Sequence, residues 1–262
     1  MRFSLLLVVL RSIAFTVMLY GFTWLMLLVI WPFFLLPDRR AWPLVKLWGR
    51  IVVWLHHVVG GTRVEWRGLE NIPEGGFLVS AKHQAMWETF ALIPMFDSAA
   101  FVLKHELGRI PIFGFGTRQM GMIAIDRSAG ARALVEMTQR AKQAIAEGRQ
   151  VIIFPEGTRT LPGAAPAYKV GVGYIYEACG APCLPVALNS GLYWPRRSWL
   201  RHPGTIIVEF LPPIAPGLPR REFLARLERG IEEASDRLIA EAAASRQPPP
   251  LPARAEPAAP SA

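Results

Sequence analysis

The sequence contains little cysteine and little histidine. Only Cys179 and Cys183 occur among its 262 residues, and no second pair repeats their spacing. A disulfide framework and a four-ligand zinc site are therefore not supported, and we expect both thiols to be reduced core residues. His56, His57 and His202 lack ligand partners at useful spacing, so we expect them at an interface or at the surface and predict no metal site.

Acidic residues are also scarce. The 20 Asp and Glu against 29 Lys and Arg give a formal charge of +9. This excess favours an anionic partner, either nucleic acid or anionic lipid. The mean hydropathy of +0.27 and the nine tryptophans favour lipid. A nucleic-acid binder is the weaker reading, because the basic residues cluster near the apolar N-terminus and no recognised binding motif occurs.

No charged residue occurs from Ser12 to Pro37, and residues 12–30 alone are long enough to cross a hydrocarbon core. The run is too long for an ordinary signal peptide and lacks a small-residue cleavage site. A second segment, 42–59, is amphipathic with Trp, Lys and Arg, as the headgroup region selects. Either the first segment spans the bilayer or the two helices form a hairpin in one leaflet. Four basic residues place the following domain on the cytoplasmic side: Arg39, Arg40, Lys46 and Arg50.

From Gly60 the pattern alternates between strands and helices. We expect strands at 62–67, 76–80, 99–103, 122–126, 150–154, 183–188 and 205–211, and helices at 88–96, 129–147, 170–178 and 221–244. This alternation predicts an α/β fold, with a mixed, mostly parallel sheet covered by helices and preceded by an N-terminal membrane-embedded helical segment. The predicted divisions are 1–59 (membrane-embedding helices), 60–245 (the α/β domain) and 246–262 (a disordered Pro/Ala tail).

The first candidate for chemistry is His83, which follows an apolar run and precedes Glu88 by five residues. A neutral imidazole is suited to accept a proton near pH 7, and a carboxylate can fix its tautomer. In a continuous helix, a spacing of five would point the two side chains to different faces. They can meet if His83 lies in the loop after a strand and Glu88 in the first turn of the next helix. The alternative is a histidine near an unrelated glutamate.

Residues 150–159 run from a buried strand directly into a polar turn. Gly157 would let the backbone approach a ligand, and Arg159 offers a planar fork for phosphate or carboxylate. The alternative is a tight turn in which Arg159 pairs with Glu156. Lys104 and Arg127 also lie at predicted strand ends, on the edge where His83 emerges. If the three cations converge, they form an anion pocket beside a general base.

Five blocks together resemble the glycerolipid acyltransferases, most closely the bacterial 1-acyl-sn-glycerol-3-phosphate acyltransferases. They are His83-x4-Glu88, Lys104-His105-Glu106-Leu107 with Ile110-Pro111-x-x-Gly114, Ile125-Asp126-Arg127, the Phe-Pro-Glu-Gly-Thr-Arg string at 154–159, and Pro-Val-Ala-Leu-Asn at 185–189. The blocks occur in family order, and the string at 154–159 is the most specific. One departure is Glu88, because the commoner carboxylate of the family is Asp, which is shorter by one methylene.

The resemblance implies that His83 removes the proton from the free hydroxyl of a lysophospholipid, oriented by Glu88. The oxygen would attack the thioester of acyl-CoA or acyl-carrier protein in a ternary complex, with no other cofactor. The chain has no Gly-x-Ser-x-Gly elbow and no Cys near a motif, in agreement with the absence of an acyl-enzyme. The family's substrate-binding positions correspond here to Lys104, Arg127, Glu156, Gly157, Thr158 and Arg159. Lys104, Arg127 and Arg159 would bind the phosphate of the acceptor.

Three functions compete at this stage. The first is formation of phosphatidic acid from 1-acyl-sn-glycerol-3-phosphate, at the cytoplasmic face of a bacterial inner membrane. The second is acylation of another lyso-lipid, such as lyso-ornithine lipid, by the same motifs. The third is an inactive membrane scaffold, which a replaced His83 or Arg159 would favour, although neither is replaced. We also expect the basic, Trp-containing loop from Tyr193 to Arg201 to lie at headgroup level, or else to be an ordinary surface loop.

Overall fold

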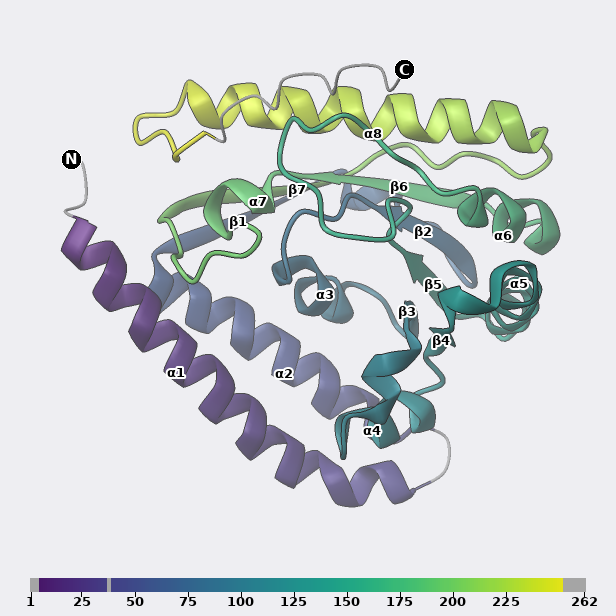
Figure 1. Ribbon diagram of the computed structural model, residues 1–262, viewed down its shortest axis with the longest axis horizontal. Coiled ribbons are helices and arrows are strands. Elements are labelled where there is room, and N and C mark those ends of the chain that lie inside the picture. The colour runs from purple at the N-terminus through teal and green to yellow at the C-terminus, as the bar shows by residue number, and fades with distance from the viewer. Residues whose placement is uncertain (1–4, 37–38, 252–262) are drawn as a thin grey trace.

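A seven-stranded sheet forms the centre of the computed structural model, which describes residues 5–36 and 39–251 (Figure 1). The strands are β1 (Thr62–Arg67), β2 (Phe77–Ala81), β3 (Ala99–Lys104), β4 (Ile123–Ile125), β5 (Gln150–Ile153), β6 (Cys183–Leu188) and β7 (Gly204–Phe210). Their order is β1-β7-β6-β2-β5-β3-β4, and every neighbouring pair is parallel except β6 and β7. The predicted mixed, mostly parallel sheet is confirmed.

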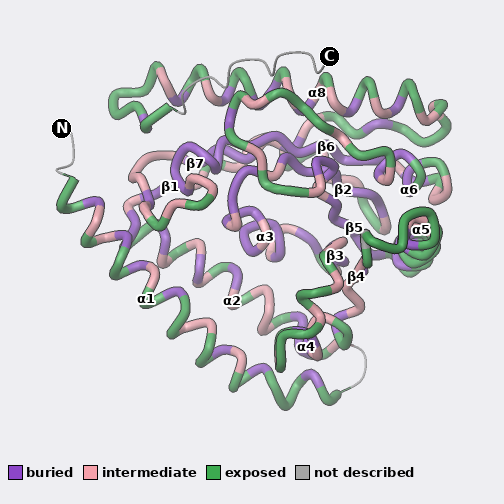
Figure 2. The backbone as a smooth tube through the Cα atoms, viewed as in Figure 1, coloured by how far each residue is buried: buried purple, intermediate pink, exposed green. Residues whose placement is uncertain are grey.

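The central strands β2, β5 and β6 are buried along their whole length, as Figure 2 shows. Their apolar runs are typical of strands covered on both faces. Because successive side chains point to opposite faces, Phe77 and Val79 belong to one core cluster and Leu78 to the other. This alternation fixes the register of β2, the strand that leads into the candidate site.

Eight α-helices surround the sheet in the described residues. They are α1 (Leu5–Ile30), α2 (Trp42–Leu55), α3 (Trp87–Ala91), α4 (Phe113–Gln119), α5 (Gly130–Ala146), α6 (Gly171–Cys179), α7 (Ser190–Tyr193) and α8 (Arg220–Ala243). One core cluster joins the sheet to α1, α2 and α3, and the other joins it to α5, α6 and α8. In Figure 1, α8 and the pair α1 and α2 accordingly lie on opposite sides of the sheet.

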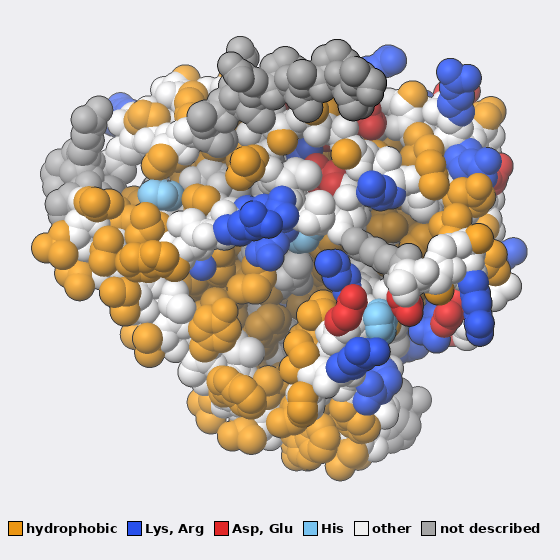
Figure 3. Space-filling model, in the orientation of Figure 1, with side chains coloured by type: hydrophobic (Ala, Val, Ile, Leu, Met, Phe, Trp, Pro, Cys, Tyr) orange, Lys and Arg blue, Asp and Glu red, His pale blue; other side chains and the backbone are white. Residues whose placement is uncertain are grey.

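The first helix, α1, carries apolar side chains on every face and a single charged residue. One face is buried against the protein through Phe15, Leu19 and Ile30, whereas Val17 and Leu28 on other faces are 67% and 65% exposed. The segment Leu5–Leu35 is long and apolar enough to cross a membrane. Figure 3 shows hydrophobic side chains gathered over the area where Figure 1 places α1, α2 and α4. An apolar surface of this kind indicates contact with lipid or with another protein.

Several element ends differ from the sequence expectation. The helix expected at 88–96 ends at Ala91 and is followed by a 3-10 turn at Ile93–Met95, because Pro94 cannot donate the backbone hydrogen bond that a continuing helix needs. The short helices α4 and α7 were not predicted. The boundaries 1–59, 60–245 and 246–262 stay predictions. Residues 252–262 of the predicted tail lie outside the described residues, as does Pro37 at the end of the uncharged run.

Of the two positions expected for His56, at an interface or at the surface, the surface position is wrong. Its ring is fully buried between Phe15 and Trp194, with centroid distances of 4.8 and 5.3 Å, and its Nε2 lies 3.2 Å from Thr62 Oγ1. The α2 helix continues into a π-helical turn at His56–Gly60, which directs the ring inward. Burial, followed by the nearby Arg201 charge, lowers the pKa of His56 to about 3. His56 is therefore a neutral core residue.

Three residues of the loop from Tyr193 to Arg201, namely Tyr193, Trp194 and Arg201, are buried rather than exposed. Trp194 is buried, and the Arg201 guanidinium lies over its ring at 3.9 Å from the centroid. The cause is α1, which covers this loop: the Arg201 backbone N–H donates to Ser12 Oγ at 2.8 Å. Trp199 is exposed. The loop thus attaches α1 to the α/β domain.

Candidate active site

The predicted site segments lie along one edge of the sheet. Strands β2, β5, β3 and β4 are adjacent and parallel, so their carboxyl ends share that edge. His83 follows β2, residues 154–159 follow β5, Lys104 ends β3 and Arg127 follows β4. The topology therefore brings the four segments into one row, as the sequence predicted.

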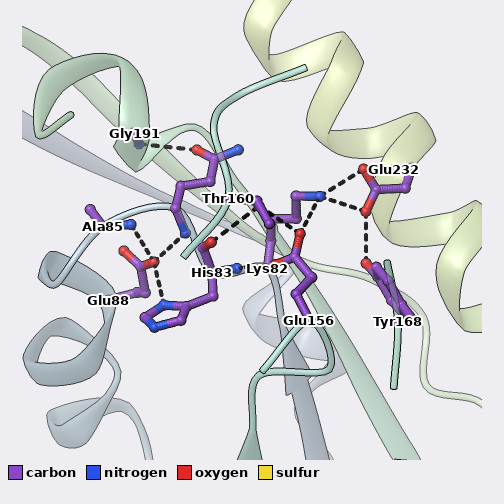
Figure 4. Close-up of polar contacts among 10 residues, drawn as sticks. Lys82, His83, Ala85, Glu88, Glu156, Thr160, Tyr168, Gly191 and Glu232 are labelled. Carbon is purple, nitrogen blue, oxygen red and sulfur yellow. Dashed lines mark hydrogen bonds and ion pairs between the residues drawn. The ribbon is translucent and has the colours of Figure 1, made fainter. Parts of the chain in front are cut away.

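His83 and Glu88 are in contact (Figure 4). His83 lies in the loop between β2 and α3, and Glu88 is the second residue of α3. The His83 Nδ1 atom is 3.0 Å from Glu88 Oε1, which also accepts the backbone N–H groups of Gln84 at 2.6 Å and Ala85 at 2.7 Å. Because His83 lies in the loop and Glu88 in the first turn of the helix, the two side chains meet despite the five-residue spacing.

The contact defines the tautomer of the imidazole. Because an ionised carboxylate only accepts hydrogen bonds, Nδ1 carries the hydrogen and Nε2 is left with a lone pair. The His83 side chain is 15% exposed, and its ring stacks on Phe154 with centroids 4.0 Å apart and planes at 17°. A held ring with one basic nitrogen is suited to accept a proton from a bound hydroxyl.

Ser190 contacts the other oxygen of Glu88. Its hydroxyl donates to Glu88 Oε2 at 2.8 Å, and both side chains are fully buried. Sequence reasoning missed Ser190, which begins α7. The available signal was its position directly after the Pro-Val-Ala-Leu-Asn block at 185–189.

Glu156 holds the backbone of His83. One carboxylate oxygen accepts the His83 backbone N–H at 2.9 Å, and the other accepts the Thr160 hydroxyl at 2.7 Å and lies 2.8 Å from Lys82 Nζ. The Thr160 backbone N–H donates to the His83 carbonyl at 2.8 Å. Since Glu156 is 2% exposed, these contacts occupy its carboxylate. Its predicted place in the acceptor site stays a prediction.

Lys82 links the site to α8. Its side chain is 2% exposed, and its ammonium lies 2.7 and 2.8 Å from the carboxylate oxygens of Glu232 (Figure 4). Tyr168 donates to Glu232 at 2.8 Å, and burial together with Glu232 raises the pKa of Tyr168. Sequence reasoning missed this buried group, because Lys and Glu are mostly exposed in proteins and no short spacing connects residues so far apart.

The predicted anion-binding cations are open to solvent. Lys104 and Arg159 are both exposed, and neither forms an ion pair with a residue that the structure describes. The side chain of Arg127 lies outside the described part. Gly157 has a φ of 68°, a left-handed conformation that favours glycine, and Thr158 beside it is exposed. The turn after β5 therefore presents backbone and positive charge together beyond the sheet edge.

Burial disfavours the thiolate form of both cysteines. Cys179 and Cys183 are both free, as predicted. Burial raises the pKa of Cys179 to about 11 and raises that of Cys183 further. Because only a thiolate attacks readily, burial disfavours nucleophilic attack by either cysteine.

Comparisons with known proteins agree with this geometry. A family model described as Acyltransferase matches residues 63–189. A Pseudomonas aeruginosa protein named 1-acyl-sn-glycerol-3-phosphate acyltransferase is 41% identical over 179 residues, which cover 68% of this chain and 70% of that protein. Lysophosphatidylcholine acyltransferase 1 of Mus musculus is 30% identical over 180 residues, covering 63% of this chain and 33% of that protein.

A solved structure is also similar. It is the crystal structure of the 1-acyl-sn-glycerophosphate (LPA) acyltransferase PlsC from Thermotoga maritima, with a TM-score of 0.70 and 25% sequence identity. The similarity covers 90% of this chain and 96% of that one.

Proposed function

The chain belongs to the acyltransferase family, and on that basis we propose that it acylates the free sn-2 hydroxyl of 1-acyl-sn-glycerol-3-phosphate, giving phosphatidic acid for phospholipid biosynthesis. The relatives from Pseudomonas aeruginosa and Thermotoga maritima, named for this activity, support the choice of acceptor. The observation that carries the proposal is the His83–Glu88 contact of 3.0 Å at the edge where the exposed cations lie.

The proposed reaction is a direct transfer between two bound substrates. His83 Nε2 takes the hydroxyl proton of the acceptor as the oxygen attacks the carbonyl carbon of the thioester. The tetrahedral intermediate then collapses, the carbon–sulfur bond breaks, and the imidazolium returns the proton to the leaving thiolate. Glu88 stabilises the imidazolium in between, as a carboxylate does in hydrolase triads. The donor is acyl-CoA or acyl-carrier protein, and the mechanism uses no metal.

The phosphate of the acceptor would bind the cations at the sheet edge. Arg159 can donate two parallel hydrogen bonds to phosphate oxygens, whereas Lys104 and Arg127 supply charge. The backbone at Gly157 and the hydroxyl of Thr158 complete the predicted acceptor site. Glu156 would act indirectly, because its carboxylate already holds the His83 backbone. Fixing both substrates in this way can supply a large part of the rate.

We place the enzyme at the cytoplasmic face of a bacterial inner membrane, with α1 lying in one leaflet. Support comes from contacts that hold α1 to the rest of the protein along its length. Ser12 accepts a hydrogen bond from Arg201 near the start of the helix, and Thr23 accepts one from Trp48 at 3.2 Å further along. Ile30 at the end of the helix is buried. If α1 crossed the bilayer, the loop and helix packed against it would have to enter the hydrocarbon as well, at a high cost in unsatisfied polar groups.

A second candidate is an O-acyltransferase for another lyso-lipid. The mouse relative, named for lysophosphatidylcholine, supports this alternative, and a lyso-ornithine acceptor would place a carboxylate on the same cations. An inactive scaffold is the third candidate, and an intact His83–Glu88 pair speaks against it.

The test is acyl transfer by membranes that contain the wild-type protein, with labelled acyl-CoA and acyl-carrier protein in separate reactions. We expect transfer to 1-acyl-sn-glycerol-3-phosphate. Transfer only to lyso-ornithine lipid or lysophosphatidylcholine would keep the mechanism and change the acceptor. Transfer to none of them with either donor would favour the scaffold.

A further inference from the structure

The Glu88 carboxylate is held by donors on both of its oxygens. Oε1 serves the imidazole and two backbone N–H groups, whereas Oε2 accepts the Ser190 hydroxyl at 2.8 Å. Glu88 is 0% exposed, so solvent does not reach it in this structure. Without the Ser190 hydroxyl, an anionic oxygen would be buried with no donor among the described residues, which is costly.

Ser190 lies in a segment that hydrogen bonds hold to β7 and to the loop between β2 and α3. The Ser190 carbonyl accepts the Trp194 N–H at 2.8 Å, and the side chain of the preceding Asn189 accepts the Ile207 N–H of β7 at 2.9 Å. The next residue, Gly191, donates its N–H to Gln84 Oε1 at 3.0 Å. The hydroxyl is therefore a fixed point, and it limits the rotation of the Glu88 carboxylate.

The length of Glu88 makes such a fixed point necessary. A glutamate has one more rotatable bond than an aspartate and reaches about 1.5 Å further, one carbon–carbon bond. Here that reach lets one oxygen contact His83 at 3.0 Å while the other contacts Ser190 at 2.8 Å. An aspartate could not keep both contacts, since the distance to His83 or the distance to Ser190 would grow beyond that of a hydrogen bond.

We infer that Ser190 is a positioning residue for acyl transfer, which fixes the Glu88 carboxylate so that its other oxygen orients His83. This inference rests on the proposed roles of His83 and Glu88. Ser190 would not touch either substrate, so its removal should slow the chemical step and leave substrate binding unchanged.

The first measurement compares Ser190→Ala with Ser80→Ala. Ser80 is equally buried and lies in β2, and its hydroxyl has no hydrogen-bond partner among the described residues. A hydrogen bond to a charged group contributes enough that we expect Ser190→Ala to lower kcat about tenfold, with KM unchanged for donor and acceptor. Ser80→Ala should retain kcat within about twofold, which corresponds to a few tenths of a kcal/mol.

The second measurement repeats Ser190→Ala in a Glu88→Asp background. If Ser190 acts through the longer carboxylate, its removal should matter less than about twofold there, because the shorter side chain cannot contact His83 and Ser190 together. A purely structural role of Ser190 in holding α7 predicts the same loss in both backgrounds.

The outcomes separate the two proposals. A Ser190→Ala kcat equal to that of Ser80→Ala overturns the inference, and so does an equal loss in the wild-type and Glu88→Asp backgrounds. If wild-type protein transfers no acyl chain, or if His83→Ala remains fully active, the proposed function fails and the inference fails with it. A melting temperature for each variant identifies any loss that comes from unfolding.

Discussion

Replacement of Lys82 by methionine should destabilise the protein strongly. The Lys82 ammonium lies 2.8 Å from Glu156 and 2.7 Å from Glu232, and its side chain is 2% exposed. Methionine preserves most of the apolar stem but removes the charge. The buried Glu156 carboxylate and the partly buried Glu232 carboxylate would then remain without the cation that compensates them.

The expected loss follows from burial. Removal of one partner from a buried ion pair costs about 3–5 kcal/mol, because the other charge stays uncompensated. In a chain of this size, that loss lowers the melting temperature by about 10 °C. Adding Glu232→Gln to Lys82→Met should recover part of the loss, since it neutralises one of the two remaining carboxylates.

The control is Arg67→Met. Arg67 also contacts two carboxylates, Glu65 and Glu241, at 2.7 Å each, but its side chain is 29% exposed. Exposed pairs contribute about 0–1 kcal/mol, so this variant should melt close to the wild type. Thermal melting of purified protein in detergent measures both variants. If Lys82→Met melts no lower than Arg67→Met, burial of the cluster is not what makes it important.

Two further predictions concern pH and lipid. The unfolded chain protonates His56 below about pH 6.5, whereas the folded chain does so only near the His56 pKa of about 3. The free energy of unfolding should therefore fall by about 2 kcal/mol between pH 6.5 and 5. Melting curves should show this loss in the wild type and a smaller loss in His56→Gln. The double variant Val17→Asp, Leu28→Asp should release the protein from anionic vesicles in flotation assays, because each charge costs up to about 3 kcal/mol in hydrocarbon. The control Val135→Asp, on the exposed face of α5, should leave the protein bound to the vesicles.

The fold could largely be predicted because its signals are local. The alternating pattern of β1 and the apolar run of β6 predicted the ends of these strands at the observed residues. By contrast, α4 was missed because its sequence, Phe-Gly-Phe-Gly-Thr-Arg-Gln, contains two glycines and has little helix propensity. The antiparallel pairing of β6 with β7 was also not predicted, since strand direction depends on the connection rather than on strand composition.

The site was predictable where its parts are close in sequence. His83 and Glu88 lie five residues apart, and the strand ends indicated which edge they share with Lys104 and Arg159. Ser190 lies 102 positions from Glu88, and Glu232 lies 150 positions from Lys82. Pairings over such distances are set by the topology of the sheet and by α8. The full burial of His56 was not predicted for a related reason, because the turn that buries it is a backbone feature without a sequence pattern.

The central claim is that His83 acts as the general base, and comparison of His83→Ala with His57→Ala tests it most directly. His57 is an exposed histidine on the turn that follows α2. A general base contributes about 10²–10⁴-fold to a rate, so kcat for acyl transfer to 1-acyl-sn-glycerol-3-phosphate should fall at least about 100-fold in His83→Ala and stay near the wild-type value in His57→Ala. A folded His83→Ala variant that retains kcat within about tenfold of the wild type, less than a general base contributes, would contradict it.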